Sequence, residues 1–197
     1  MSKIFSEETY NDMIGKLFVR FPSFQKTGAS AYKPGIGNME FFDQLAGHPH
    51  KNYKIIHVAG TNGKGSVSNM LASVLSSQGM KVGLYTSPHI LDFRERMRVV
   101  SADCHTLVPR EYVWSFVNQW QETFDHLDMS FFEITTSMAL SWFADRKVDL
   151  HPRQVRNDTR YKFHDNGQGK QGDDAAEGRQ GHRQSHIAFD QHRKNIG

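Results

Sequence analysis

Seven consecutive residues carry the clearest chemical potential in this sequence. Glycines let the backbone come close to a phosphate group, and the N–H groups at the start of a helix point toward an anion. A lysine in the run adds a mobile positive charge, and a serine hydroxyl suits a phosphate or Mg²⁺. The run therefore predicts a turn that binds nucleotide phosphates, formed by Gly60, Thr61, Asn62, Gly63, Lys64, Gly65 and Ser66.

The spacing of this run differs from the general phosphate-loop pattern G-x-x-x-x-G-K-[ST]. Only Thr61 and Asn62 separate the first two glycines, and Gly65 stands between the lysine and the serine. A glycine-rich turn without chemical purpose is the alternative. Such a turn seldom needs four special residues and a lysine, so nucleotide binding is the favoured interpretation.

The elements around the run are those that a phosphate-binding turn requires. Residues 53–59 form a short β-branched apolar run, typical of a buried parallel strand. A helix follows and ends at Gly79, and residues 81–85 form a second strand. Strand, turn, helix and strand make a βαβ unit, and the helix has its apolar face at Met70, Leu71, Val74 and Leu75.

Four more helices and one loop are predicted within residues 1–150. A helix follows Ser6, with apolar residues at Tyr10, Met13, Ile14, Leu17 and Phe18. Residues 21–37 read as a loop, after which Asn38 caps a short helix through Leu45. Pro109 is expected at the first position of a helix that carries Val113, Phe116, Val117, Trp120 and Phe124, and Ser130 opens another that carries Ile134, Met138, Leu140 and Phe143.

The charge distribution excludes a basic nucleic-acid-binding domain in residues 1–150. Residues 1–150 hold 15 Lys and Arg against 15 Asp and Glu, so the net charge of +3 belongs to the remainder. No apolar run approaches the length of a membrane helix, and the first residues turn acidic, so we expect a cytoplasmic protein. The single cysteine, Cys104, is expected to be an unpaired thiol.

The composition changes after Leu150. Residues 151–197 contain no Leu, Met, Trp or Cys, and such a segment cannot build a core. We expect a disordered tail, read out of frame or by a similar gene-level accident, with a genuine disordered tail as the alternative. Its histidines lack cysteine partners and do not predict a metal site: His151, His164, His182, His186 and His192.

Two stretches around the predicted turn resemble a known family. They are HVAGTNGKGSV at residues 57–67 and LYTSPHILDFRERMRV at residues 84–99. Both are similar to the folylpolyglutamate synthase/dihydrofolate synthase family of the Mur ligase superfamily, in its N-terminal part. The resemblance extends to AYKPGIGNM at 31–39 and SFFEITTSMAL at 130–140, and covers nearly all of residues 20–150.

The resemblance implies a fold and a reaction. The fold is α/β: an incomplete P-loop-type doubly wound parallel sheet, the truncated central domain of a Mur ligase, over residues 1–150. The reaction is ATP-dependent ligation of L-glutamate to dihydropteroate or folate through an acyl phosphate. ATP and Mg²⁺ are the implied cofactors, with Lys64 as the catalytic residue; nucleic acid and membranes are not expected partners.

The resemblance also implies two Mg²⁺ ligands, Ser87 and Glu133. Each has a structural alternative, because Ser87 precedes Pro88 in a turn and Ser130 to Glu133 is a capping-box pattern. A folate pocket is implied for the following segment, although composition alone favours a solvated face for its charged run. The implied pocket residues are Pro88, His89, Phe93, Arg94 and Arg96.

Two other functions remain open. One is a nucleotide-binding fragment without ligase activity. The other is a Mur-type peptidoglycan ligase, which shares chiefly the Gly-Lys-Ser/Thr turn, whereas TSPHILDFRER at residues 86–96 favours the folate branch.

Overall fold

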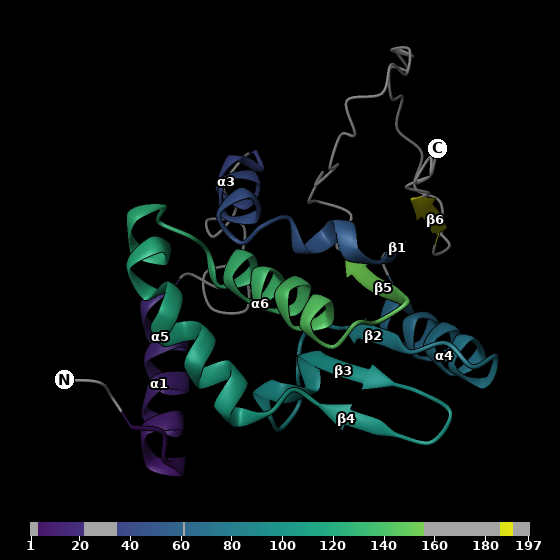
Figure 1. Cartoon of the computed structure of the whole chain (residues 1–197), viewed down its shortest axis with the longest axis horizontal. Coiled ribbons are helices and arrows are strands. Elements are labelled where there is room, and N and C mark those ends of the chain that lie inside the picture. Colours follow the sequence, from purple (N-terminus) through teal and green to yellow (C-terminus); the bar gives the residue numbers. More distant parts are fainter. Residues whose placement is uncertain (1–3, 22–34, 61, 156–185, 191–197) are drawn as a thin grey trace.

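The computed structural model describes residues 4–21, 35–60, 62–155 and 186–190 (Figure 1). From residue 151 onward only the backbone of two strands is described. Thr61, most of the predicted loop at 21–37 and the side chains of the tail histidines therefore lie outside the described residues.

A six-stranded sheet forms the centre of the fold, in the order β4-β3-β2-β5-β1-β6. β1 and β2 both run parallel to β5, which lies between them, while the other neighbouring pairs are antiparallel. The expected parallel sheet is thus parallel only at its centre. The strands are β1 Lys54–Ala59, β2 Val82–Tyr85, β3 Met97–Val100, β4 His105–Leu107, β5 Leu150–Val155 and β6 His186–Asp190.

Helices cover both faces of the sheet (Figure 1). Ile55 of β1 packs into one core with α6, whereas its neighbour Ile56 packs with Ala72 of α4 in a second core. Successive strand residues point to opposite faces, so α4 and α6 lie on opposite sides. The helices are α1 Glu7–Arg20, α3 Gly37–Leu45, α4 Lys64–Ser77, α5 Arg110–His126 and α6 Phe131–Asp145, with short 3₁₀ turns η2 Pro49–Asn52 and η3 Phe93–Arg96.

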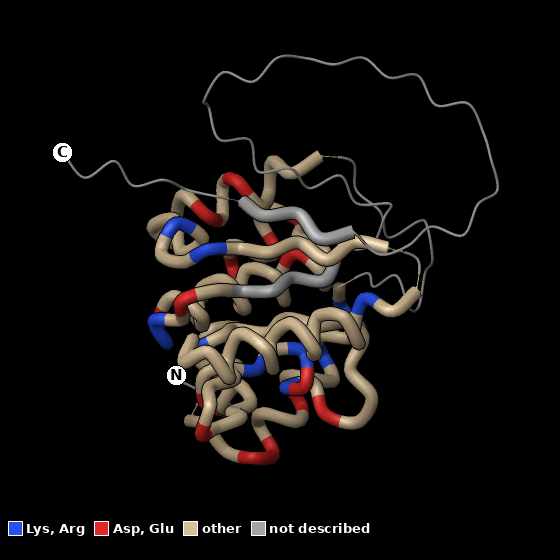
Figure 2. Tube along the Cα trace, turned by 90° about the vertical axis from the view of Figure 1, so that its right-hand side faces the viewer, with Lys and Arg blue, Asp and Glu red and all other residues tan. Residues whose placement is uncertain are grey.

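Three of the predicted helices are confirmed by the structure. Ser6 caps α1 by accepting from the Thr9 N–H, and Tyr10 and Leu17 are buried on its inner face. α5 buries four of its five predicted apolar residues, and α6 begins directly after Ser130. Lys and Arg are interspersed with Asp and Glu along the described chain (Figure 2).

Two predicted helix starts are displaced by one or two positions. The short helix begins at Gly37 after Ile36, so Asn38 lies inside it and does not cap it. Pro109 has extended backbone, with φ −63° and ψ 145°, and is the N-cap of α5; it is not the first helical residue. Both differences are at helix ends, where sequence patterns constrain the boundary least.

The predicted apolar face of α4 is partly wrong. Met70 and Val74 are 67% and 60% exposed, whereas Ser68, Ala72 and Ser76 are buried. The small side chains allow α4 to lie close to the sheet, and only Leu71 and Leu75 of the predicted set pack against that core. A helix face made of small residues such as serine and alanine does not appear as an apolar stripe in the sequence.

The sheet continues across Leu150, where the composition of the sequence changes. Leu150 is the first residue of β5 and is buried, and the backbone of residues 151–155 pairs with β1 and β2. Among the described residues no helix has the length and apolar composition needed to cross a membrane. Cys104 is exposed and carries a free thiol.

Candidate functional site

The glycine-rich run lies between the end of β1 and the start of α4, as predicted. β1 ends at Ala59, and Gly63 is the N-cap of α4 with a left-handed backbone, φ 76°. A residue with a Cβ is disfavoured at such a φ, so the backbone conformation explains why glycine occupies this position. Thr61 is outside the described residues.

The first turn of α4 presents positive potential at this end of the sheet. Lys64 is the first helical residue, and its Nζ donates to the carbonyl oxygen of Gly60 at 2.7 Å, so the ammonium group lies over the turn. Asn62 and Ser66 are exposed. The N–H groups of a first helical turn have no intrahelical acceptor, and the helix dipole adds to their attraction for an anion.

The two candidate Mg²⁺ ligands lie on adjacent elements. Ser87 is half-buried, follows β2 and precedes Pro88 in a cis peptide bond. The hydroxyl groups of Tyr85 and Thr135 are 2.8 Å apart and join the end of β2 to the first turns of α6, which contain Glu133. Because β1 and β2 both run parallel to β5, their carboxyl ends lie at the same edge of the sheet.

Glu133 is a capping residue in this structure. Its Oε2 accepts from the Ser130 N–H at 2.7 Å, and its own N–H donates to Ser130 Oγ at 3.3 Å. The capping-box prediction is therefore confirmed, and Glu133 is buried, with 3% of the residue exposed. A role as Mg²⁺ ligand remains a prediction.

Part of the expected folate-contacting segment is buried. Arg96 is 3% exposed, its Nε donates to His89 Nδ1 at 2.8 Å, and its guanidinium lies 5.0 Å from the centre of the Phe131 ring. Burial lowers the pKa of Arg96, and burial together with the Arg96 charge lowers the pKa of His89. A solvated face, the alternative for this run, is therefore wrong for Arg96.

Phe93 and Arg94 also have partners within the protein. Phe93 is buried and meets the Phe131 ring edge to face, with centroids 6.3 Å apart. Arg94 binds the Asp92 carboxylate through Nε and Nη2, the latter at 2.7 Å from Oδ2. Of the five implied pocket residues, Pro88 is the exposed one.

Comparison with known proteins finds the same resemblance in sequence and in structure. No protein-family model matches the chain. The dihydrofolate synthase/folylpolyglutamate synthase of Bacillus subtilis is 39% identical over 125 residues, 60% of this chain and 28% of that protein. The crystal structure of folylpolyglutamate synthase from Thermotoga maritima matches with a TM-score of 0.62 and 33% identity, over 75% of this chain and 33% of that one. This chain is similar to folylpolyglutamate synthases in sequence and in structure.

A further match is a folylpolyglutamate synthase complex with AMPPCP and folate, with a TM-score of 0.61 and 31% identity over 74% of this chain. The expected family resemblance and the Mur-ligase-like α/β fold are thereby confirmed over about 75% of the chain. The chain spans between 28% and 35% of the length of these relatives.

One group of chemically capable side chains escaped the sequence analysis. Asp43, His48 and His50 come together before β1, although none was singled out. The signal available in the sequence was the His-x-His spacing close to an acidic residue.

Proposed function

We propose that this chain supplies the nucleotide-binding turn of an ATP-dependent ligase. The ligase joins L-glutamate to folate or dihydropteroate and acts in the cytoplasm, with neither nucleic acid nor membrane as a partner. The observation that carries the proposal is the position of the glycine-rich turn, between the end of β1 and the exposed first turn of α4. The relationship to a synthase bound to AMPPCP and folate supports the nucleotide and the substrate class.

The proposed reaction has two steps. A carboxylate oxygen of the folate or dihydropteroate attacks the γ-phosphorus of ATP, so that an acyl phosphate forms and ADP leaves. The amine of glutamate then attacks the acyl carbon, an amide bond forms, and phosphate and a proton leave. Both steps develop negative charge on the phosphoryl oxygens, which nearby cations and N–H groups stabilise.

Lys64 is the proposed catalytic cation. Its Nζ contacts the Gly60 carbonyl at 2.7 Å, so the ammonium is already positioned above the turn that would hold the phosphates. The turn itself binds through Gly60, Thr61, Asn62, Gly63, Gly65 and Ser66, whose N–H groups and hydroxyl serve as donors.

Ser87 and Glu133 fit a Mg²⁺ site by their chemistry. Both offer oxygen atoms, which this hard cation prefers, and the Tyr85–Thr135 contact holds their elements together. When bound, Mg²⁺ neutralises phosphate charge. Glu133 Oε2 accepts from Ser130, so this chain's own cap orients the carboxylate.

The test measures ATP binding and ADP release for the wild-type chain and for Lys64→Ala. Lys64→Ala is expected to weaken ATP binding and to lower ADP release in the presence of folate and glutamate by roughly 100-fold or more. Lys16→Ala is the matched control, because Lys16 lies exposed on α1 and pairs with Asp12.

The outcomes separate the possible functions. ADP release that requires both folate and glutamate supports the ligase. ATP binding without such release assigns the chain a nucleotide-binding role alone. Equal ATP affinity in the wild-type and Lys64→Ala chains would overturn the assignment of the turn.

A further inference from the structure

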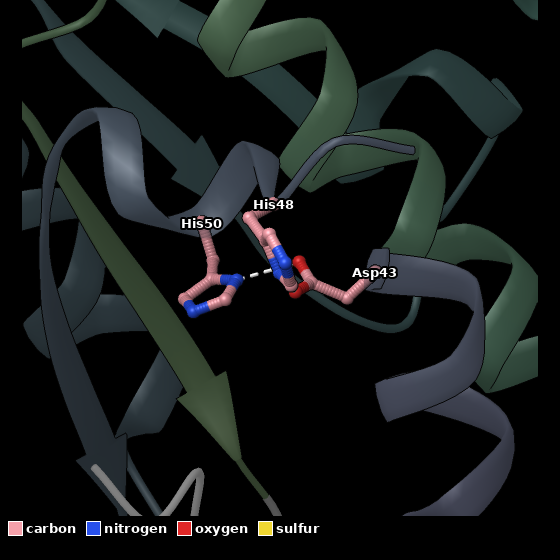
Figure 3. A group of neighbouring side chains, drawn as sticks. All are labelled: Asp43, His48 and His50. Carbon is pink, nitrogen blue, oxygen red and sulfur yellow. Dashed lines mark hydrogen bonds and ion pairs between the residues drawn. The ribbon is translucent and has the colours of Figure 1, made fainter. Parts of the chain in front are cut away.

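Three side chains converge just before the start of β1, at the opposite end of this strand from the glycine-rich turn (Figure 3). Asp43 lies on α3, His48 directly precedes η2, and His50 lies within η2. His48 Nδ1 is 2.7 Å from Asp43 Oδ2, and His50 Nδ1 is 2.5 Å from Asp43 Oδ1. The possible ligand atoms of the three residues all lie within 4.8 Å of one another.

The backbone is shaped to bring these side chains together. Gly47 and His48 both have left-handed backbones, with φ 75° and 58°. The His48 N–H also donates to the Asp43 carbonyl oxygen at 2.8 Å. A histidine with positive φ is uncommon, and the bend returns both imidazoles to the same carboxylate.

The burial and charge of the group suit a bound cation. Asp43 is only 5% exposed, and His50 is largely buried, whereas His48 is 44% exposed at its side chain and borders solvent. The carboxylate oxygens of Asp43 thus face two imidazole nitrogens inside the protein, and the solvent side of the group, at His48, can admit an ion.

We propose that Asp43, His48 and His50 form a binding site for one divalent transition-metal ion, with Zn²⁺ as the best match. Two imidazole nitrogens and one carboxylate oxygen are a ligand set that Zn²⁺ accepts, with water in the fourth position. Mg²⁺ prefers oxygen ligands and is a poor match for two imidazoles.

Coordination through Nδ1 requires the tautomer of each ring that leaves Nδ1 unprotonated and carries the proton on Nε2, while Asp43 supplies a carboxylate oxygen. The Nδ1–O separations widen as the ion enters between the three ligand atoms. The ion then replaces the hydrogen bonds that close the group in this structure.

The position of the site indicates a structural role. It joins the end of α3 to the segment that leads into β1, and β1 separates it from the glycine-rich turn by about 20 Å at the usual rise per residue. An ion at this distance does not touch nucleotide phosphates. It joins α3 to η2, the turn that leads into β1, and its binding raises the stability of the folded chain.

The test measures Zn²⁺ affinity and stoichiometry in the full chain, by competition with a chromophoric chelator at neutral pH. His48→Asn removes one imidazole, and asparagine tolerates the left-handed backbone of this position. Loss of a partner that merely orients a ligand costs 10-fold to 100-fold in affinity, so loss of a ligand should cost at least about tenfold. His126→Asn is the control, because His126 is exposed at the end of α5.

The expected result is that the wild type and His126→Asn each bind one equivalent of Zn²⁺ more tightly than His48→Asn does, and that Zn²⁺ raises the Tm of these two chains more than that of His48→Asn. Equal Zn²⁺ binding by the wild type and His48→Asn would mean that Asp43 and the two histidines are only a hydrogen-bonded clamp. A second measurement does not depend on a variant: Co²⁺ should shift the ring-proton resonances of His48 and His50 in the wild type. Unshifted resonances overturn the proposal.

Discussion

Arg98 on β3 holds Asn69 on α4 through a hydrogen bond from Nη2 to Oδ1 of 2.8 Å. Asn69 in turn donates from Nδ2 to the carbonyl oxygen of Gly65 at 2.7 Å. The sheet is thereby connected to the first turn of α4, which forms part of the proposed phosphate site.

Asn69→Ala should weaken ATP binding without a direct contact to the nucleotide. The substitution removes both hydrogen bonds, so the unfolding free energy should fall by about 1 kcal/mol or somewhat more, and the affinity for ATP should fall severalfold. Chemical denaturation and an ATP titration measure the two effects. Ser77→Ala on the exposed end of the same helix should change neither, and an unaltered ATP affinity in Asn69→Ala would contradict the positioning role.

Two variants separate the capping role of Glu133 from its proposed role in binding Mg²⁺. Glu133→Gln keeps an oxygen that can accept from the Ser130 N–H, so the fold should survive while Mg²⁺-dependent ATP binding falls. Ser130→Ala removes the hydroxyl that accepts from the Glu133 N–H, at a cost of about 1 kcal/mol in unfolding free energy. Ser130→Ala should leave Mg²⁺ binding nearly unchanged, and equal Mg²⁺ dependence in the wild type and Glu133→Gln would remove Glu133 from the metal site.

Gly83→Ala should destabilise the fold because α6 lies directly against β2 at this point. A Cβ on Gly83 would be 2.7 Å from Cγ and Cδ1 of Phe143, a fully buried side chain. Overpacking of this kind costs about 1–3 kcal/mol. Urea denaturation should show that loss.

The smaller ring-free side chain in Phe143→Leu provides the control for Gly83→Ala. Combined in one chain, the two substitutions should destabilise by less than the sum of their separate effects, because the new Cβ occupies space that the ring has left. If the two losses of unfolding free energy simply add, Gly83→Ala destabilises the fold for a reason other than contact with Phe143.

Asp92 should contribute to the acid sensitivity of the fold. Hydrogen bonds from the Arg94 side chain hold the pKa of its carboxyl below the ordinary value of 3.8, despite the opposing effect of burial. A lowered folded-state pKa means that the stabilisation is present above the unfolded-state pKa and is lost as the pH falls through the folded-state pKa. The difference in unfolding free energy between the wild type and Asp92→Asn should therefore shrink between about pH 5 and about pH 2.

Asp103→Asn is a suitable control for this pH series, because Asp103 is exposed in the turn between β3 and β4. Its unfolding free energy should follow that of the wild type at every pH. A constant gap between the wild type and Asp92→Asn across the series would show that the Asp92–Arg94 pair does not titrate as described.

The sequence predicts well those features that depend on local patterns. Ser6 and Ser130 begin helices as expected, and the glycine-rich turn joins a strand to a helix. The capping by Ser6 and Ser130 is decided by a few neighbouring residues, so it can be predicted without the tertiary structure. The exposed side chain of Met70 shows the limit, since which face of α4 is buried depends on how closely the sheet approaches.

Contacts between side chains of different elements are the hardest to predict from the sequence. Arg96 lies in a charged run that is typical of a solvated face, yet it is buried between His89 and Phe131. Asp43 and His50 meet only because of a bend at Gly47 and His48. On such contacts a single sequence offers only the residue types and their spacing, as with His48 and His50.

The place of β5 in the sheet has a consequence for how the chain folds. β1 and β2 come early in the sequence and do not pair with each other. Both pair with β5, whose residues follow all five of the described α-helices. During synthesis, the edges of β1 and β2 that pair with β5 stay unpaired until Leu150–Val155 has left the ribosome. Sheets completed by such sequence-distant strands assemble slowly, so the nascent chain is exposed to self-association until β5 has been synthesised.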